Sequence, residues 1–188
     1  EILRCLVGSE MCIRDRHSAM LSPDPYVITW TNVQRNVSMA CGVGKTPEER
    51  YAHARDFVRL VGLEDYADLT PMELSTGMKQ RLGLARVLAG QAELLMDEPF
   101  ASLDFLTREE LQTQLLQIQA RMPRTIVLVT HQLDEALLLG QRIVVMHPDS
   151  TLREFDLTAL PYPRDLSAPD MQRLKREITA ECKKDAAL

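Results

Sequence analysis

Apolar residues follow two spacings along this chain, and their alternation predicts an α/β fold. Recurrence every three or four positions indicates helices that begin near Pro47, Gly77, Thr107, Leu133 and Ala168. Short continuous apolar runs, typical of buried strands, occupy residues 94–98, 125–130 and 142–147, and residues 152–157 are expected to add an edge strand. Strand, helix, strand is the doubly wound order, in which ligands bind at the carboxyl ends of the strands.

The turn before the second of these helices is built from small polar residues. Ser75, Thr76 and Gly77 leave several backbone N–H groups without an intrahelical acceptor, and a glycine lets a ligand approach the backbone closely. The positive end of the helix dipole adds to this, so the turn suits a phosphate group. The alternative is an ordinary serine N-cap. Gly90 is expected to end the helix.

The apolar run 94–98 ends in two neighbouring carboxylates, Asp97 and Glu98. Successive side chains of a strand point in different directions, so Asp97 can hold a hydrated Mg²⁺ while Glu98 faces a water molecule beside a terminal phosphate. This division of labour is typical of nucleotide hydrolysis. The alternative is a solvated acidic turn before Pro99.

A histidine follows the next predicted strand. The β-branched run 125–130 suits a central parallel strand, and His131 stands at its carboxyl end. Because ligand sites of doubly wound folds lie at that edge, Asp97, Glu98 and His131 are expected on the same side of the sheet. A lone histidine in such a position is more commonly an ordinary loop residue.

Four segments resemble, in this order, motifs of the nucleotide-binding subunits of ATP-binding cassette (ABC) transporters. Leu74-Ser75-Thr76-Gly77-Met78 is similar to the family signature, with Thr76 and Met78 as variants. The strand ending at Glu98 resembles Walker B, Ser102-Leu103-Asp104 resembles the D-loop, and His131 resembles the switch histidine. The resemblance runs from about Met20 onward, and it is closest to the nitrate, sulfonate and taurine importer group.

The resemblance implies a P-loop NTPase-like ABC ATPase fold with a helical signature subdomain at about 33–90, using ATP and Mg²⁺. It implies that Glu98 and His131 are catalytic and that Asp97 supports Mg²⁺. It also implies that residues 74–78 and Asp104 contact ATP across a dimer. The implied partners are a second ATPase subunit, transmembrane permease subunits and, indirectly, a substrate-binding protein, at the cytoplasmic face of the bacterial inner membrane.

Two segments depart from the family pattern. Pro23 occupies the Q-loop position, where the family has glutamine, and the nearby Trp30 is either a partner-facing anchor or part of the core. Residues 42–46, GVGKT, imitate the end of a P-loop, but the first glycine of that motif falls at Met39. A capping box at Thr46 and Glu49 explains the segment better, so the fold is expected to be incomplete, without its Walker A part.

The two ends of the chain are expected to lie outside the ATPase domain. Residues 1–16 resemble translated adapter sequence, which predicts a non-native segment and a natural start near His17. The alternative is a natural strand at Ile2–Val7, on a sheet edge. Residues 17–150 are then a partial ABC ATPase domain, and residues 151–188 form a linker and a C-terminal helix.

Charge and cysteine usage exclude some functions. The net charge of −5 argues against a nucleic-acid surface, which normally needs a basic face. No apolar run approaches the roughly 20 residues that cross a bilayer, so membrane association is expected through a partner protein. The 4 cysteines include no CxxC pair, which argues against a structural zinc site.

Together these features predict the ATP-hydrolysing subunit of an importer for a small anion such as nitrate, sulfonate or taurine. The chain is expected to be a fragment that lacks the P-loop and is inactive by itself. The alternative is a catalytically silent interaction module that keeps the signature face. A cassette ATPase of DNA repair or translation fits less well, because there is no room for a coiled-coil insertion and no basic tail.

Overall fold

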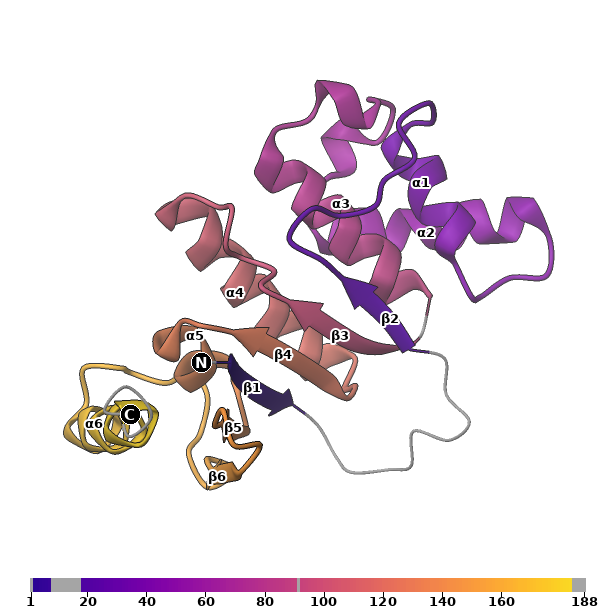
Figure 1. Cartoon of the computed structure of the whole chain (residues 1–188). Coiled ribbons are helices and arrows are strands. Elements are labelled where there is room, and N and C mark those ends of the chain that lie inside the picture. Colours follow the sequence, from indigo (N-terminus) through magenta and orange to yellow (C-terminus); the bar gives the residue numbers. More distant parts are fainter. Residues whose placement is uncertain (1, 8–17, 91, 184–188) are drawn as a thin grey trace. The chain divides into compact units, whose positions relative to one another are not determined.

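The structure is a computed structural model in which residues 2–7, 18–90 and 92–183 are described (Figure 1). The chain forms two compact units. Residues 12–123 make up the first, named the helical unit, and residues 1–11 with 124–188 make up the second, named the sheet unit. In the described part of the chain, no helix is both long and apolar enough to cross a lipid bilayer.

The helical unit combines four helices with a pair of parallel strands. Its helices are α1 (Val33–Ala40), α2 (Pro47–Leu60), α3 (Thr76–Ala89) and α4 (Phe105–Arg121), and 3-10 turns lie at Glu64–Tyr66 and Pro71–Glu73. Strands β2 (Ser18–Leu21) and β3 (Glu93–Asp97) pair in parallel. The sequence does not predict β2, because its four residues include neither β-branched nor aromatic side chains.

Side-chain caps determine where the helices of this unit begin. The hydroxyl of Thr46 accepts a hydrogen bond from the backbone N–H of Glu49 at 3.2 Å, and the Glu49 carboxylate accepts one from the N–H of Thr46 at 3.3 Å. The capping box predicted for α2 is therefore confirmed, and residues 42–46 lead into it. The helix start predicted near Thr107 is wrong, because Asp104 is the N-cap and α4 already begins at Phe105.

The core of the helical unit lies where α1, α2 and α3 pack on one another. The buried apolar side chains of these helices include Val33, Val37, Ala54, Val58, Leu82, Ala85 and Leu88. Removing each such valine or leucine from water stabilises the fold by roughly 1.5–3 kcal/mol. Trp30 lies outside this core with 83% of its surface exposed, so the reading of Trp30 as a core residue is wrong.

The sheet unit is built on antiparallel strands. Strand β1 (Ile2–Val7) lies between β4 (Ile126–Thr130) and β5 (Arg142–Met146) and is antiparallel to both. A strand at 2–7 is therefore confirmed, but its predicted edge position is wrong. Residues 125–130 are predicted as a central parallel strand, and this prediction is wrong where β4 meets β1, because the two strands are antiparallel. The non-native origin of residues 1–16 and the boundary at 150 stay predictions.

The remaining elements of the sheet unit match the predicted ones closely. Among the described strands, β6 (Leu152–Asp156) pairs only with β5 and forms an edge of this unit. Helix α5 (Leu133–Leu139) packs on β1 and β4, and helix α6 (Pro169–Lys183) packs on α5 and β5. The guanidinium of Arg164 is buried and donates to the carbonyl oxygens of Leu137, at 2.7 Å, and of Leu157, at 3.1 Å. Arg164 lies in the segment 151–188 that is predicted as a linker and a C-terminal helix, and it is thus bound to this unit.

Candidate functional site

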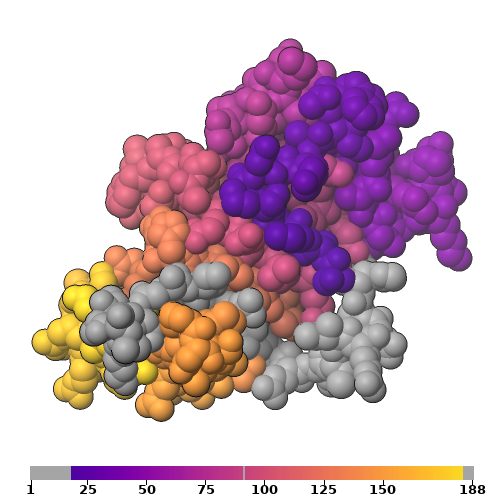
Figure 2. Space-filling view, in the orientation of Figure 1, coloured from indigo at the N-terminus to yellow at the C-terminus, as the bar shows by residue number. Residues whose placement is uncertain are grey.

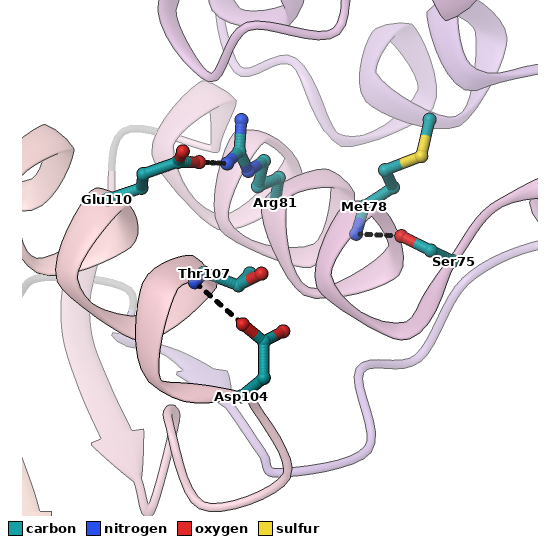
Figure 3. Close-up of polar contacts among 6 residues, drawn as sticks. All are labelled: Ser75, Met78, Arg81, Asp104, Thr107 and Glu110. Atoms are coloured by element: carbon teal, nitrogen blue, oxygen red, sulfur yellow. Dashed lines mark hydrogen bonds and ion pairs between the residues drawn. The ribbon is translucent and has the colours of Figure 1, made fainter.

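The polar turn at the start of α3 has the geometry of a helix N-terminus open to ligands. Ser75 is the N-cap, and its hydroxyl accepts a hydrogen bond from the N–H of Met78 at 3.3 Å (Figure 3). The N–H groups of Thr76 and Gly77 precede it in the first turn and have no intrahelical acceptor. Ser75 and Thr76 are exposed, whereas Leu74 is buried. The turn therefore offers two backbone N–H donors without an intrahelical acceptor, at the positive end of a helix dipole.

The structure brings this turn against the start of α4. A Cβ atom added at Gly77 would lie 2.6 Å from Cγ2 of Thr107, so a larger residue at this position requires the Thr107 side chain to shift. One helical turn further along, the side chains of Arg81 and Glu110 form an ion pair between the same two helices (Figure 3). The predicted signature and D-loop residues are consequently neighbours within the helical unit.

Asp104 is tied into this junction by its cap. Its carboxylate accepts a hydrogen bond from the backbone N–H of Thr107 at 3.1 Å (Figure 3). Hydrogen bonds from the side chain and backbone of Thr107 hold the pKa of Asp104 below its ordinary value of 3.8. The carboxylate is exposed and stays ionised near neutral pH, so the site has a fixed negative charge beside the signature turn.

The two predicted catalytic carboxylates lie where β3 ends. Leu94 and Met96 are buried, and Asp97 is the last residue of the strand. Glu98 is a non-glycine residue in the left-handed region, with φ of 45°, and its carbonyl accepts a hydrogen bond from the N–H of Ala101 at 3.1 Å. This conformation costs about 1–3 kcal/mol, and it persists because the surrounding structure imposes it. The predicted strand therefore ends one residue earlier, and Glu98 is set by a tight turn.

A cleft of about 650 Å³ opens beside the predicted Q-loop position. Its walls are Ser22, Pro23, Asp24, Pro25, Tyr26, Val27, Thr29, Pro71, Met72 and Lys79. Tyr26 is 89% exposed, and Met72 and Trp30 are also exposed. Figure 2 shows the segment after β2, in indigo, on the surface of the helical unit. The cleft is thus an open, partly aromatic surface with one lysine.

Sequence reasoning missed the residue that connects these parts. The amide nitrogen of Gln80 donates to the carbonyl of Pro99 at 2.6 Å and to the carbonyl of Ser22 at 3.4 Å. Gln80 is only 2% exposed. A usable signal was present, because Gln80 is a polar residue four positions before the buried Leu84, on the packed face of α3.

His131 belongs to the sheet unit, where it follows β4 directly, as predicted. The turn at this point is held by Thr130, whose buried hydroxyl donates to the carboxylate of Glu135 at 2.7 Å and accepts from the N–H of Gln132 at 3.0 Å. His131 is exposed. Its position at the carboxyl end of a strand therefore agrees with the sequence, and its distance from Asp97 and Glu98 stays a prediction.

The residues present are compatible with Mg²⁺. Asp97 supplies a carboxylate oxygen at a strand end, and Mg²⁺ is commonly held by one or two carboxylates together with substrate phosphates and water. Among the described residues, no cluster of three or more histidine, cysteine, aspartate or glutamate side chains forms a metal cage. A strand-end carboxylate of this kind suits an Mg²⁺ ion that is also held by substrate phosphates.

The sequence of the chain is similar to ABC proteins. The family model described as ABC transporter matches residues 4–101, just over half of the 188 residues. A putative ATP-binding protein of Brucella abortus is 40% identical over 167 residues, which cover 84% of this chain and 64% of the relative. A taurine import ATP-binding protein of Rhizobium johnstonii is 42% identical over 135 residues, covering 70% and 52%. A glycine betaine/carnitine transport ATP-binding protein of Listeria monocytogenes is 46% identical over 123 residues, covering 64% and 31%.

Solved structures show the same fold. The dimeric ATP-binding cassette MJ0796, in a post-hydrolysis state bound to ADP and Pi, matches with a TM-score of 0.64 and 28% identity over 77% of this chain and 65% of that chain. An inward-facing metal-chelate type ABC transporter matches with a TM-score of 0.63 at 18% identity, covering 77% and 60%. These matches show the α/β ABC ATPase fold. The chain spans 31% to 64% of the length of the three sequence relatives above.

Proposed function

The chain belongs to the ABC transporter family, and we propose that it is part of the ATP-binding and ATP-hydrolysing subunit of an importer for a small anion such as nitrate, sulfonate or taurine. Similarity to a taurine import ATP-binding protein supports the proposed substrate class. The proposed location is the cytoplasmic face of a bacterial inner membrane, where the subunit is attached through its permease partners. A second copy of the subunit completes the proposed dimer.

The observation that carries this proposal is the junction inside the helical unit. The free N–H groups of Thr76 and Gly77 lie next to the capped start of α4, and the same helix α3 reaches the residue after Glu98 through Gln80. Phosphate-binding donors and a strand-end carboxylate pair are therefore connected by one buried helix. Such a combination suits a subunit that couples phosphate binding at the signature turn to phosphate cleavage at the strand-end carboxylates.

In the proposed reaction each residue has one task. Bound Mg²⁺ would neutralise charge on the phosphates, and Asp97 would hold it. Glu98 accepts a proton from the attacking water as general base, and His131 donates a hydrogen bond to the terminal phosphate. The signature residues 74–78 and Asp104 face the nucleotide held by the second subunit, where the α3 amides bind its phosphate oxygens.

The cleft beside Pro23 is the proposed contact with the permease. In the family that the chain resembles, the helical subdomain receives the coupling helices of the membrane subunits, and the exposed Tyr26, Trp30 and Met72 would supply apolar surface for them. Aromatic and methionine side chains are enriched at protein interfaces. The substrate-binding protein is then an indirect partner, on the other side of the membrane.

The first experiment is to change Glu98→Gln in the full-length protein. Removing a positioned general base should slow ATP turnover about 10²–10⁴-fold, while ATP binding is retained, because the amide keeps the size of the side chain. Steady-state ATPase rates and equilibrium ATP binding measure the two quantities. Glu109→Gln is the matched control, since Glu109 is an exposed glutamate on α4 and should leave the rate unchanged. Unchanged turnover in Glu98→Gln would contradict the role of Glu98.

The alternative function is a catalytically silent interaction module. The observation that favours it is Pro23, because a proline at the Q-loop position cannot supply the glutamine side chain of the family pattern. The full-length protein would then bind its permease without hydrolysing ATP. Uptake of labelled taurine into vesicles that contain the assembled transporter separates the two functions, and glycine betaine is the competing substrate to include.

A further inference from the structure

We infer that Gln80 is a positioning residue that links the Pro23 cleft to the turn that holds Glu98, and that it acts in this way in the proposed ATP hydrolysis. The inference rests on the proposed function for its catalytic part. The link itself is a property of the helical unit, so it can be tested separately from activity.

The side chain of Gln80 spans two segments that are far apart in the sequence. Its amide nitrogen has two hydrogens, and it uses them for the carbonyls of Pro99, at 2.6 Å, and Ser22, at 3.4 Å. Pro99 is the residue after Glu98, and Ser22 is the residue before Pro23. One amide group on α3 therefore connects the catalytic turn with the wall of the cleft.

Two further residues of α3 support this connection on the same face of the helix. A Cβ atom at Gly83 would lie 2.5 Å from Cβ of Pro25 and 3.0 Å from Cδ1 of Leu21, so the helix backbone packs directly on the segment after β2. The guanidinium of Arg86 is half buried and donates to the carbonyl of Tyr26. Positions 80, 83 and 86 follow helical spacing, so one face of α3 packs on residues 21–26.

The hydrogen bond to Pro99 matters because the preceding residue, Glu98, has a strained backbone conformation. Glu98 occupies the left-handed region, at a φ of 45°, and relies on its surroundings to remain there. The bond from Gln80 is short and buried, and it ends one residue from Glu98. The Gln80 amide oxygen is buried and has no hydrogen-bond partner among the described residues, so the side chain bonds through its nitrogen alone. Removing that nitrogen would break the hydrogen bonds to Ser22 and to Pro99 together.

A purely structural role would produce a different result from a positioning role. A core residue that only adds stability changes the unfolding midpoint and leaves the kinetics of the folded protein intact. A positioning residue instead changes the catalytic step, with substrate binding preserved.

Gln80→Leu removes both hydrogen bonds at similar volume, and Gln80→Met is the second variant if the first fails to fold. Gln112→Leu is the matched control, because Gln112 is also a buried glutamine but lies on α4 instead of α3.

The experiment combines amide hydrogen exchange with ATPase kinetics on the full-length protein. In Gln80→Leu we expect about tenfold faster exchange in peptides covering 22–27 and 98–103 together, and about tenfold lower kcat at unchanged KM for ATP. A tenfold change in rate corresponds to about 1.4 kcal/mol. Gln112→Leu should change neither quantity.

Each outcome decides one part of the inference. Faster exchange in only one of the two segments, or in neither, overturns the link. Faster exchange in both with an unchanged kcat overturns the positioning role, while the proposed function stands. If the parent protein hydrolyses no ATP, the proposed function fails and the positioning role fails with it, whereas the exchange data still decide whether Gln80 links the two segments.

Discussion

Asp104 shows how a single carboxylate can serve the fold and the candidate site together. Its oxygen caps α4 through the N–H of Thr107, and that threonine touches the glycine of the signature turn. The ionised carboxylate also interacts favourably with the positive end of the α4 dipole. The lowered pKa of Asp104 follows from these bonds, so its contribution to folding depends on pH.

At this scale we predict how stability varies with pH. A lowered folded pKa means that the stabilisation is fully present above the ordinary value of 3.8 and is lost as pH falls through the lower folded value. Asp104→Asn keeps a capping oxygen but cannot ionise. The wild type should melt about 1–3 °C above this variant at pH 7, and the difference should be smaller at pH 3, which lies below the ordinary value of 3.8. Scanning calorimetry at both pH values tests this, and a difference that stays constant would contradict it.

At the scale of elements, α3 organises the helical unit. Its N-terminus carries the signature turn, one face packs on the segment after β2, and Gln80 reaches the turn beyond β3. The close packing depends on Gly83, where the helix approaches Pro25 without an intervening side chain. Glycine normally weakens a helix by about 1 kcal/mol relative to alanine, so its presence here indicates a packing requirement.

We therefore predict that Gly83→Ala destabilises the protein despite its better helix propensity. The new methyl group would overlap Pro25, and overpacking of this kind costs about 1–3 kcal/mol. Urea unfolding measures the change as a lower midpoint. Thr113→Ala on the exposed face of α4 is the control and should stabilise slightly, because it improves propensity without a new contact. A raised midpoint for Gly83→Ala would show that the segment after β2 moves aside.

At the scale of the whole molecule, the first strand is the least expected element. Strand β1 joins β4 to β5, and Arg4 lies opposite Val129 on one side and Val144 on the other. A strand with neighbours on both sides uses its backbone groups in both directions. The sheet unit therefore depends on residues that the sequence marks as a candidate non-native segment.

Accordingly, Arg4→Pro should destabilise the sheet unit. Proline has no backbone N–H, so a carbonyl of a neighbouring strand loses its hydrogen-bond donor. Leaving such a buried group unpaired lowers the stability by about 1–3 kcal/mol. Arg4→Thr keeps the N–H and suits a strand, so it should fold like the parent chain. Thermal unfolding followed by circular dichroism compares the two variants. Equal melting temperatures would mean that the β1 ladder contributes nothing, and the prediction of a non-native segment at 1–16 would gain support.

The sequence alone determined the features that depend on neighbouring residues. The capping box at Thr46 and Glu49, the serine cap of α3 and the helix end at Gly90 all follow from local backbone chemistry and periodicity. The order of four motifs also identified the family, since motif spacing is a property of the chain itself. Local hydrogen bonds and apolar spacing need no knowledge of distant segments.

Only the tertiary structure decided which residues meet. It showed that α4 begins at Phe105, before the expected start near Thr107, because the Asp104 carboxylate accepts the N–H of Thr107 and caps the helix. It placed β1 between two strands, and it showed Gln80 bound to Pro99 and Ser22, 19 and 58 positions away. Pairing across such separations depends on long-range packing, which a local pattern does not encode.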